Sequence, residues 1–186
     1  MDPTAKQPDE EWGGVLDTPS KESEDLVDVL GRVGIFEGLS NEELRQIERI
    51  VHRRAYRPQE TIVRQGAPGV GMYIIQSGAA NVLLESEDGQ VIRLAELKDG
   101  QFFGEMSLLD ASPRSASVAA TERSRIIGFF RADLMDLIAR SPQLGFRIVF
   151  QLSLLMEKRL RETMNEFRSA QHTLRDLQDA EDDGEA

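Results

Sequence analysis

The 186-residue sequence contains no cysteine, only two histidines and no long apolar run. Without cysteine the chain has no disulfide, no thiolate nucleophile and no cysteine-ligated metal site. His52 and His172 lie far apart, without the spacing of metal ligands. No apolar stretch approaches the ~18 residues that span a bilayer, and the polar, acidic N-terminal residues are unlike a secretory signal. We therefore expect a cytoplasmic protein without a metal site and without membrane contact.

Acidic residues are concentrated at the two ends of the chain. The net charge is −11, but residues 1–30 hold nine acids and two bases, residues 176–186 hold six acids and no base, and residues 31–175 hold 18 acids and 20 bases. Segments of like charge with few apolar residues resist packing, so residues 1–25 and 179–186 are predicted to be acidic disordered tails. Such tails repel phosphates, and nucleic acid is therefore not expected as a partner.

Between these tails the hydrophobic periodicity changes twice. Residues 26–58 are assigned to an N-terminal helical segment, in which Ser40 and Glu43 form a capping box before apolar residues at helical spacing. Short aliphatic runs of period two, separated by glycine turns, fill residues 59–131 and predict an all-β sandwich, barrel or jelly roll. Residues 132–178 are predicted to form a short helix that ends before Pro142 and then a long helix.

Residues 102–118, with the sequence FFGEMSLLDASPRSASV, carry the pattern most specific for chemistry. Gly104 lets the backbone approach a ligand closely, and the N–H groups of the short helical turn after it can face an anion. Arg114 can bind a phosphate in bidentate fashion, with Ser115 adding a hydroxyl. Glu105 can accept hydrogen bonds from a sugar. The pattern predicts a sugar-phosphate pocket, although a turn glycine and a surface ion pair between Glu105 and Arg114 would use the same residues.

This segment resembles the phosphate-binding cassette of the cyclic-nucleotide-binding domain family, which occurs in the catabolite activator protein, protein kinase regulatory subunits and cyclic-nucleotide-gated channels. Residues 73–78 and 87–89 resemble two turns of the same family. The resemblance implies a mainly β fold with flanking helices: an eight-stranded jelly-roll-like β-roll with an N-terminal helical bundle and a long C-terminal helix. The sequence departs from the family pattern at Val70–Gly71 and at Ala79–Ala80, both in turn or edge positions.

The resemblance also implies a cyclic nucleotide, cAMP or cGMP, as the ligand. We favour cAMP, because family members with Pro-Arg-Ser-Ala in the cassette more often bind it. Glu105 is expected to bind the ribose 2′-hydroxyl, and Arg114 and Ser115 the cyclic phosphate. The full set of ligand-binding residues, carried over by position, is Gly104, Glu105, Met106, Ser107, Arg114, Ser115 and Ala116.

The long helix is the expected lid over the purine. Its candidate lid residues are Leu152, Met156 and Arg159. An apolar stripe on this helix must be buried against something; it comprises Leu144, Ile148, Leu152, Leu155, Met156 and Leu160. A marginal heptad seam follows, with Leu160, Phe167 and Leu174 seven residues apart. Two alternatives stay open: one helix folded back on its own β-roll, or a homodimer through residues 143–178.

No helix-turn-helix, kinase, cyclase or channel segment is recognisable after residue 142, so we expect a stand-alone, bacterial-type sensor module or regulatory fragment that acts on an unknown effector protein. Catalysis is not expected. Glu105 and Asp110 could form a carboxylate pair, but β-roll metal enzymes need inward-facing histidines, and the predicted strands contain none. The alternative function is a degenerate β-roll that serves as a ligand-independent dimerisation scaffold.

Overall fold

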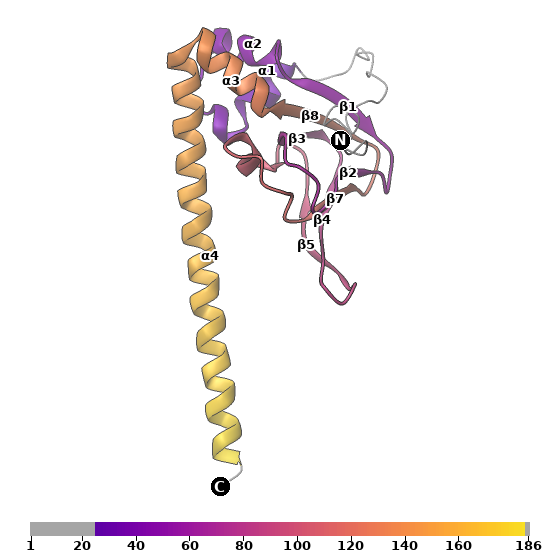
Figure 1. Cartoon of the computed structure of the whole chain (residues 1–186), viewed down its shortest axis with the longest axis vertical. Coiled ribbons are helices and arrows are strands. Elements are labelled where there is room, and N and C mark those ends of the chain that lie inside the picture. The colour runs from indigo at the N-terminus through magenta and orange to yellow at the C-terminus, as the bar shows by residue number, and fades with distance from the viewer. Residues whose placement is uncertain (1–24, 185–186) are drawn as a thin grey trace, which may run out of the picture.

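The computed structural model describes residues 25–184, with side chains described for residues 25–172. Two antiparallel four-stranded sheets pack face to face, and helices cover the outer face of one of them (Figure 1). The predicted mainly β fold with flanking helices is confirmed, as two separate sheets rather than a closed barrel. The helical elements are α1 (Leu26–Gly31), the 3-10 turn η2 (Gly34–Phe36), α2 (Asn41–Glu48), the 3-10 turn η3 (Glu105–Leu108), α3 (Arg131–Arg140) and α4 (Pro142–Gly184).

The strand order of both sheets requires crossovers between them. The first sheet has the order β1-β8-β3-β6 and the second has the order β2-β7-β4-β5. The strands are β1 (His52–Tyr56), β2 (Thr61–Val63), β3 (Gly71–Ser77), β4 (Ala80–Glu85), β5 (Val91–Leu97), β6 (Phe102–Phe103), β7 (Ser117–Ala120) and β8 (Ser124–Phe130). Consecutive strands of the chain therefore alternate between sheets in several places, as in a jelly roll.

The period-two pattern of β3 divides the apolar residues between two cores. Met72 and Ile74 belong to the core shared with the helices, whereas Tyr73 and Ile75 belong to the core between the two sheets. Successive side chains of a strand point to opposite faces of its sheet, so a strand covered on both faces is apolar throughout. Strand β3 is the clearest case, because its first five residues are all buried.

Local sequence signals set the helix boundaries. The Ser40 hydroxyl accepts a hydrogen bond from the Glu43 N–H at 3.3 Å, and the Glu43 carboxylate accepts one from the Ser40 N–H at 2.8 Å, which confirms the predicted capping box of α2. Helix α3 ends at Arg140 and Pro142 begins α4. Proline suits the first position of a helix because its φ is already helical and its missing N–H would have no partner there.

Two predicted boundaries differ from the structure. Residues 52–56, assigned to the N-terminal helical segment, form strand β1 at the edge of the first sheet. Only Tyr56 of this strand is buried, so the strand lacks a period-two apolar signal. Helix α4 continues past 178 to Gly184, because neither glycine nor proline interrupts it between 146 and 183. The predicted tail at 1–25 lies outside the described residues apart from Asp25, which caps α1.

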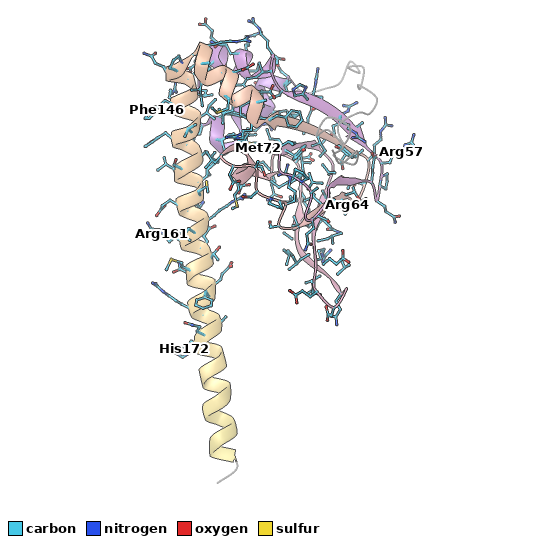
Figure 2. All side chains as sticks on the ribbon, viewed as in Figure 1. Arg57, Arg64, Met72, Phe146, Arg161 and His172 are labelled. Atoms are coloured by element: carbon cyan, nitrogen blue, oxygen red, sulfur yellow. The ribbon has the colours of Figure 1, made fainter. Side chains whose placement is uncertain are left out.

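Helix α4 packs on the body of the protein through its N-terminal part and then extends beyond it (Figure 1). Leu144, Ile148 and Leu152 are buried in the helix-side core, and Leu155 and Met156 pack against it. Leu160, predicted to continue this stripe, is instead 62% exposed, because the helix has passed the edge of the core. The side of α4 that faces away from the β-roll carries exposed apolar residues, among them Phe146. Figure 2 shows Phe146 and Arg161 on this side of the helix.

Candidate functional site

The cassette, residues 102–118, starts with a left-handed turn at Gly104. This residue has φ 75° and ψ 18° and precedes η3. Glycine is required for two reasons: a residue with a Cβ is strained at positive φ, and a Cβ here would lie 2.3 Å from Arg114 Nη1. The turn therefore places its backbone directly against the arginine side chain.

Arg114 is the buried cation of the cassette, with only 8% of its surface exposed. Its Nη2 donates to the Gly71 carbonyl at 2.8 Å, and its Nη1 donates to Ser107 Oγ at 3.0 Å and to the Gly104 carbonyl at 3.4 Å. The guanidinium carbon lies 5.2 Å from the centroid of the Tyr73 ring. All four partners are neutral, so these contacts within the described residues leave the charge of Arg114 without a carboxylate counter-ion. A buried cation in this condition favours an anion beside it.

Glu105 connects the cassette to helix α4. The residue is 5% exposed, and its Oε1 accepts a hydrogen bond from Arg159 Nη1. The Arg159 guanidinium carbon also lies 5.2 Å from the centroid of the Phe102 ring. A buried carboxylate needs such a partner, because removing a lone charge from water is costly. The site therefore combines two arginines and one carboxylate from segments that are far apart in the sequence.

Hydrogen bonds between Asp110 and Ser112 stabilise the loop that connects η3 to Arg114. The Ser112 hydroxyl donates to the Asp110 carboxylate at 2.6 Å, and the Ser112 N–H donates to it at 3.2 Å. These hydrogen bonds, the hydroxyl first, hold the pKa of Asp110 below its ordinary value. The backbone of Arg114 is then fixed by Ala67, whose carbonyl accepts from the Arg114 N–H at 2.9 Å. Asp110 therefore shapes the loop instead of pairing with Glu105.

The structure brings four of the predicted ligand-binding residues together: Gly104, Glu105, Ser107 and Arg114. Ser107 differs from its expected role as a backbone donor. Its N–H donates to the Gly104 carbonyl at 3.1 Å, as the third residue of a 3-10 turn does, so its hydroxyl is the group that faces the arginine.

The other three predicted ligand-binding residues are more open. The Met106 side chain is 59% exposed, so only its backbone belongs to the turn beside Arg114. Ser115 is exposed and Ala116 is half-buried; both follow Arg114 directly in the chain.

The three candidate lid residues lie in different environments. Leu152 is fully buried in the helix-side core, which also contains Leu108 of η3, and Met156 packs against this core. Only Arg159 makes a described polar contact with the cassette. Helix α4 thus meets the cassette in two ways, through a shared apolar core and through one ion pair.

Two glycines of the candidate site, in the segment that leads from β2 into β3, were not identified as site residues from sequence. A Cβ at Gly69 would lie 2.1 Å from Ser107 Oγ, and one at Gly71 would lie 2.4 Å from the Phe129 carbonyl. Gly71 also supplies the carbonyl that accepts from Arg114. The available signal was glycine near a strand start, which often marks a close approach of two backbones. The departure from the family pattern at Gly71 was expected to lie in a turn or edge position, but this residue contacts Arg114 and belongs to the candidate site.

Among the described residues no group of three or more histidine, cysteine, aspartate or glutamate side chains is arranged to hold a metal ion. In the same part of the chain, no helix has the length and apolar content needed to cross a membrane.

The sequence pattern of the cyclic nucleotide-binding domain matches residues 53–141. The chain is 38% identical over 128 residues to the cyclic AMP receptor protein of Thermus thermophilus, an alignment that covers 69% of this chain and 57% of that protein. It is 34% identical over 94 residues to the type II regulatory subunit of cAMP-dependent protein kinase from Drosophila melanogaster, covering 50% of this chain and 25% of the subunit. The chain thus spans 57% or less of the length of these two relatives.

A solved cyclic nucleotide-binding domain from Methylobacillus flagellatus matches with a TM-score of 0.67 at 28% identity, covering 76% of this chain and 79% of that one. The crystal structure of the Thermus thermophilus catabolite activator protein matches with a TM-score of 0.66 at 36% identity, covering 72% of this chain and 61% of that one. The sequence pattern, the two relatives and the two solved structures all indicate the same family. Through residues 53–141, this chain belongs to the cyclic nucleotide-binding domain family.

Proposed function

We propose that this protein is a cyclic-nucleotide sensor with a binding role and no catalytic one, and that cAMP is its ligand. In this proposal Arg114 pairs with the cyclic phosphate, and Glu105 accepts a hydrogen bond from the ribose 2′-hydroxyl. The turn at Gly104 and the Met106 backbone lie beside the phosphate, with Ser115 and Ala116 at its far edge. The relatives support a regulatory role, because their names describe a receptor and a kinase regulatory subunit.

The observation that carries this proposal is the buried Arg114, whose hydrogen bonds within the described residues all go to neutral acceptors. A monoanionic phosphodiester would supply the missing negative charge. A hydrogen bond to a charged group contributes roughly 1.5–3 kcal/mol net, and a phosphate can accept two of them from one guanidinium. A neutral ligand would gain neither advantage.

The preference for cAMP over cGMP is supported by the relatives whose names include cyclic AMP. Ser115 does not separate the two nucleotides, because a hydroxyl can bond either the phosphate or a guanine amino group.

The second part of the proposal is that helix α4 transmits nucleotide binding to a second copy or to an effector protein. The helix shares an apolar core with η3 and contacts Glu105, so a change at the cassette can alter its position. An exposed apolar stripe then offers a surface for a second copy through residues 143–178 or for an effector protein. The stripe consists of Phe146, Phe150, Leu154, Leu160, Met164 and Phe167.

A ligand-independent dimerisation scaffold is the second candidate, and one observation favours it. Both Arg114 and Glu105 are more than nine-tenths buried and have hydrogen-bond partners within the protein. A β-roll that has lost its ligand would satisfy its polar groups in this way.

Calorimetric titration of the full chain with cAMP, cGMP and 5′-AMP separates the two candidates. We expect cAMP to bind, and Arg114→Ala to weaken binding by roughly 2–5 kcal/mol, because the phosphate loses its counter-charge in a desolvated site. Arg140→Ala is the matched control, since Arg140 is exposed and its ion pair within the described part of the chain is with Asp136 on the same helix, α3. Thermal melts of each variant check that it is folded. Equal cAMP affinities for wild type and Arg114→Ala would reject the site, and no binding by folded wild type would favour the scaffold.

A further inference from the structure

A group of arginines lies on the helix side of the first sheet, on the paired strands β1 and β8. Ile127 of β8 belongs to the helix-side core, and Arg53 of β1 is its partner across the strand pair. Successive side chains of a strand point to opposite faces, so Arg125 lies on the same face as Ile127. Arg53 and Arg125 are therefore diagonal neighbours, a relation that separates two residues by about 7–8 Å.

Two more arginines lie at the same end of these strands. Arg57 directly follows β1 and Arg123 directly precedes β8, and the antiparallel pairing of Tyr56 with Ser124 brings them close together. Figure 2 shows Arg57 at the edge of the molecule, on the opposite side from helix α4. The side chains of Arg53, Arg57 and Arg123 are exposed. The name arginine cluster is used below for Arg53, Arg57, Arg123 and Arg125.

The nearby carboxylate of Glu60 is engaged elsewhere. It accepts a hydrogen bond from Arg54 Nη2 at 2.8 Å and another from the backbone N–H of Arg57 at 2.9 Å. In the part of the chain that the structure describes, no ion pair involves the side chains of Arg53, Arg57 or Arg123. Clustered charges of one sign create a local potential that attracts the opposite charge. The arginine cluster therefore favours an anionic neighbour.

Residues 1–24 carry the opposite charge. They hold seven acids and two bases, a net charge of −5, whereas the four arginines and the adjacent Glu122 give +3. Three consecutive acids, residues 9–11, directly precede Trp12, which is the only tryptophan of the chain. The N-terminal sequence thus supplies both the charge that the cluster lacks and a fluorescent probe beside it.

This segment joins the described structure on the same side of the first sheet as the arginine cluster. Asp25 caps α1, whose Leu26 and Val27 lie in the same core as Ile127. Trp12 can extend at most about 45 Å from Asp25, whereas the seven residues of β8 span about 23 Å. A short tether also gives its segment a millimolar effective concentration. Residues 1–24 therefore have an advantage over a separate acidic partner of similar charge.

We propose that residues 1–24 dock on the arginine cluster of the same chain as an acidic cover, with residues 9–11 against the arginines. This interaction is additional to nucleotide binding and does not depend on it. Contacts between exposed charges are individually weak and are screened by salt, so the docking is electrostatic and reversible. A separate anionic partner reaches the cluster only by displacing the segment.

Acrylamide quenching of Trp12 fluorescence in the full-length protein tests this docking, with a synthetic peptide of residues 1–24 as the undocked reference. The cluster variant replaces three exposed arginines: Arg53→Gln, Arg57→Gln and Arg123→Gln. The matched control removes the same charge from exposed positions on β5, α3 and α4: Arg93→Gln, Arg140→Gln and Arg168→Gln.

At low salt we expect wild type and the control to be quenched less than the peptide, and the cluster variant to be quenched as the peptide is. Raising the salt to about 1 M shortens the screening length to about 3 Å, so wild type should then also reach the value of the peptide. Equal quenching of wild type and the cluster variant at low salt would overturn the proposal. Thermal melts check that each variant is folded, and the salt titration of wild type decides the question if the cluster variant is not: protection that persists at high salt would overturn the proposal.

A charge exchange separates direct contact from an indirect effect of the substitutions. Arg53→Glu with Arg57→Glu should abolish the protection of Trp12, and adding Glu10→Arg with Glu11→Arg should restore it. No recovery would overturn the pairing of these segments. Dilution identifies the chain that supplies the acidic segment: protection that is independent of protein concentration supports docking within one chain. Protection that is lost on dilution would assign the cluster to the segment of a second copy and overturn the proposal.

Discussion

Replacing Gly104 by alanine tests whether the cassette turn and Arg114 are in contact as the structure places them. Gly104 has φ 75°, and its added Cβ would lie 2.3 Å from Arg114 Nη1 and 3.1 Å from the Gly71 carbonyl oxygen. Ordinary contacts of a Cβ begin at 3.4 Å, so Nη1 has to move by more than an ångström. That movement disrupts its 3.0 Å hydrogen bond to Ser107 Oγ.

Two terms contribute to the expected loss of stability. An L-residue in the left-handed region costs roughly 1–2 kcal/mol, and loss of a hydrogen bond from a charged donor costs roughly 1.5–3 kcal/mol. Gly100→Ala isolates the first term, because Gly100 has φ +79° with no heavy atom within 4 Å of the added Cβ. We therefore expect Gly104→Ala to be about 1.5–3 kcal/mol less stable than Gly100→Ala.

Urea denaturation followed by circular dichroism measures both variants against wild type, with the denaturant slope showing whether unfolding remains comparable. The difference between the two variants is the decisive quantity, since both share the backbone strain. Equal losses for Gly104→Ala and Gly100→Ala would refute the claim that Arg114 is held against the turn. They would also remove the steric reason for glycine at this position.

Three further outcomes follow from burial, capping and the exposed stripe of α4. Leu152→Ala should lower the free energy of unfolding by about 2–5 kcal/mol because Leu152 is fully buried. Met135→Ala, at an exposed position of α3, should change it by less than about 0.5 kcal/mol. Similar losses for the two variants in urea titrations would contradict the burial of Leu152. The pKa of Glu43 lies below its ordinary value of 4.5, chiefly because its carboxylate accepts a hydrogen bond from the Ser40 N–H. Ionised Glu43 therefore stabilises the fold above pH 4.5, and this stabilisation is lost as the pH falls through the lowered pKa. Glu43→Gln should therefore lose stability less steeply than wild type on acidification, and identical pH profiles would count against the cap. Phe167→Glu should weaken self-association in sedimentation if the stripe joins two copies, and an unchanged profile would favour a helix that acts alone or on another protein.

The parts of the fold that sequence predicted correctly depend on local chemistry. The capping box of α2 needs only Ser40 and Glu43, three residues apart, and the end of α3 needs only Pro142 two residues on. The β-roll was predicted because short aliphatic runs recur along the chain between glycine turns. Gly104, Glu105 and Arg114 were found because they lie within one short segment whose order resembles a family motif.

The predictions that differ from the structure involve partners distant in sequence. Strand β1 is polar and is recognised only by its pairing with β8, from His52–Gly128 to Tyr56–Ser124. The exposure of Leu160 depends on where the helix-side core ends, which helical periodicity does not encode. Gly71 acquires its role from a carbonyl directed at an arginine 43 residues later.

The sequence by itself determined the family, the β-roll and the identity of the cassette residues, because glycine turns, strand period and a short motif are all readable along the chain. Only the tertiary structure decided that Arg114 lies among neutral acceptors and that Glu105 is paired with Arg159. The pairing depends on the rotation of α4 about its axis and on its packing height above the cassette. Both are set by burial of Leu144, Ile148 and Leu152 in a core built from distant segments, which no local pattern specifies.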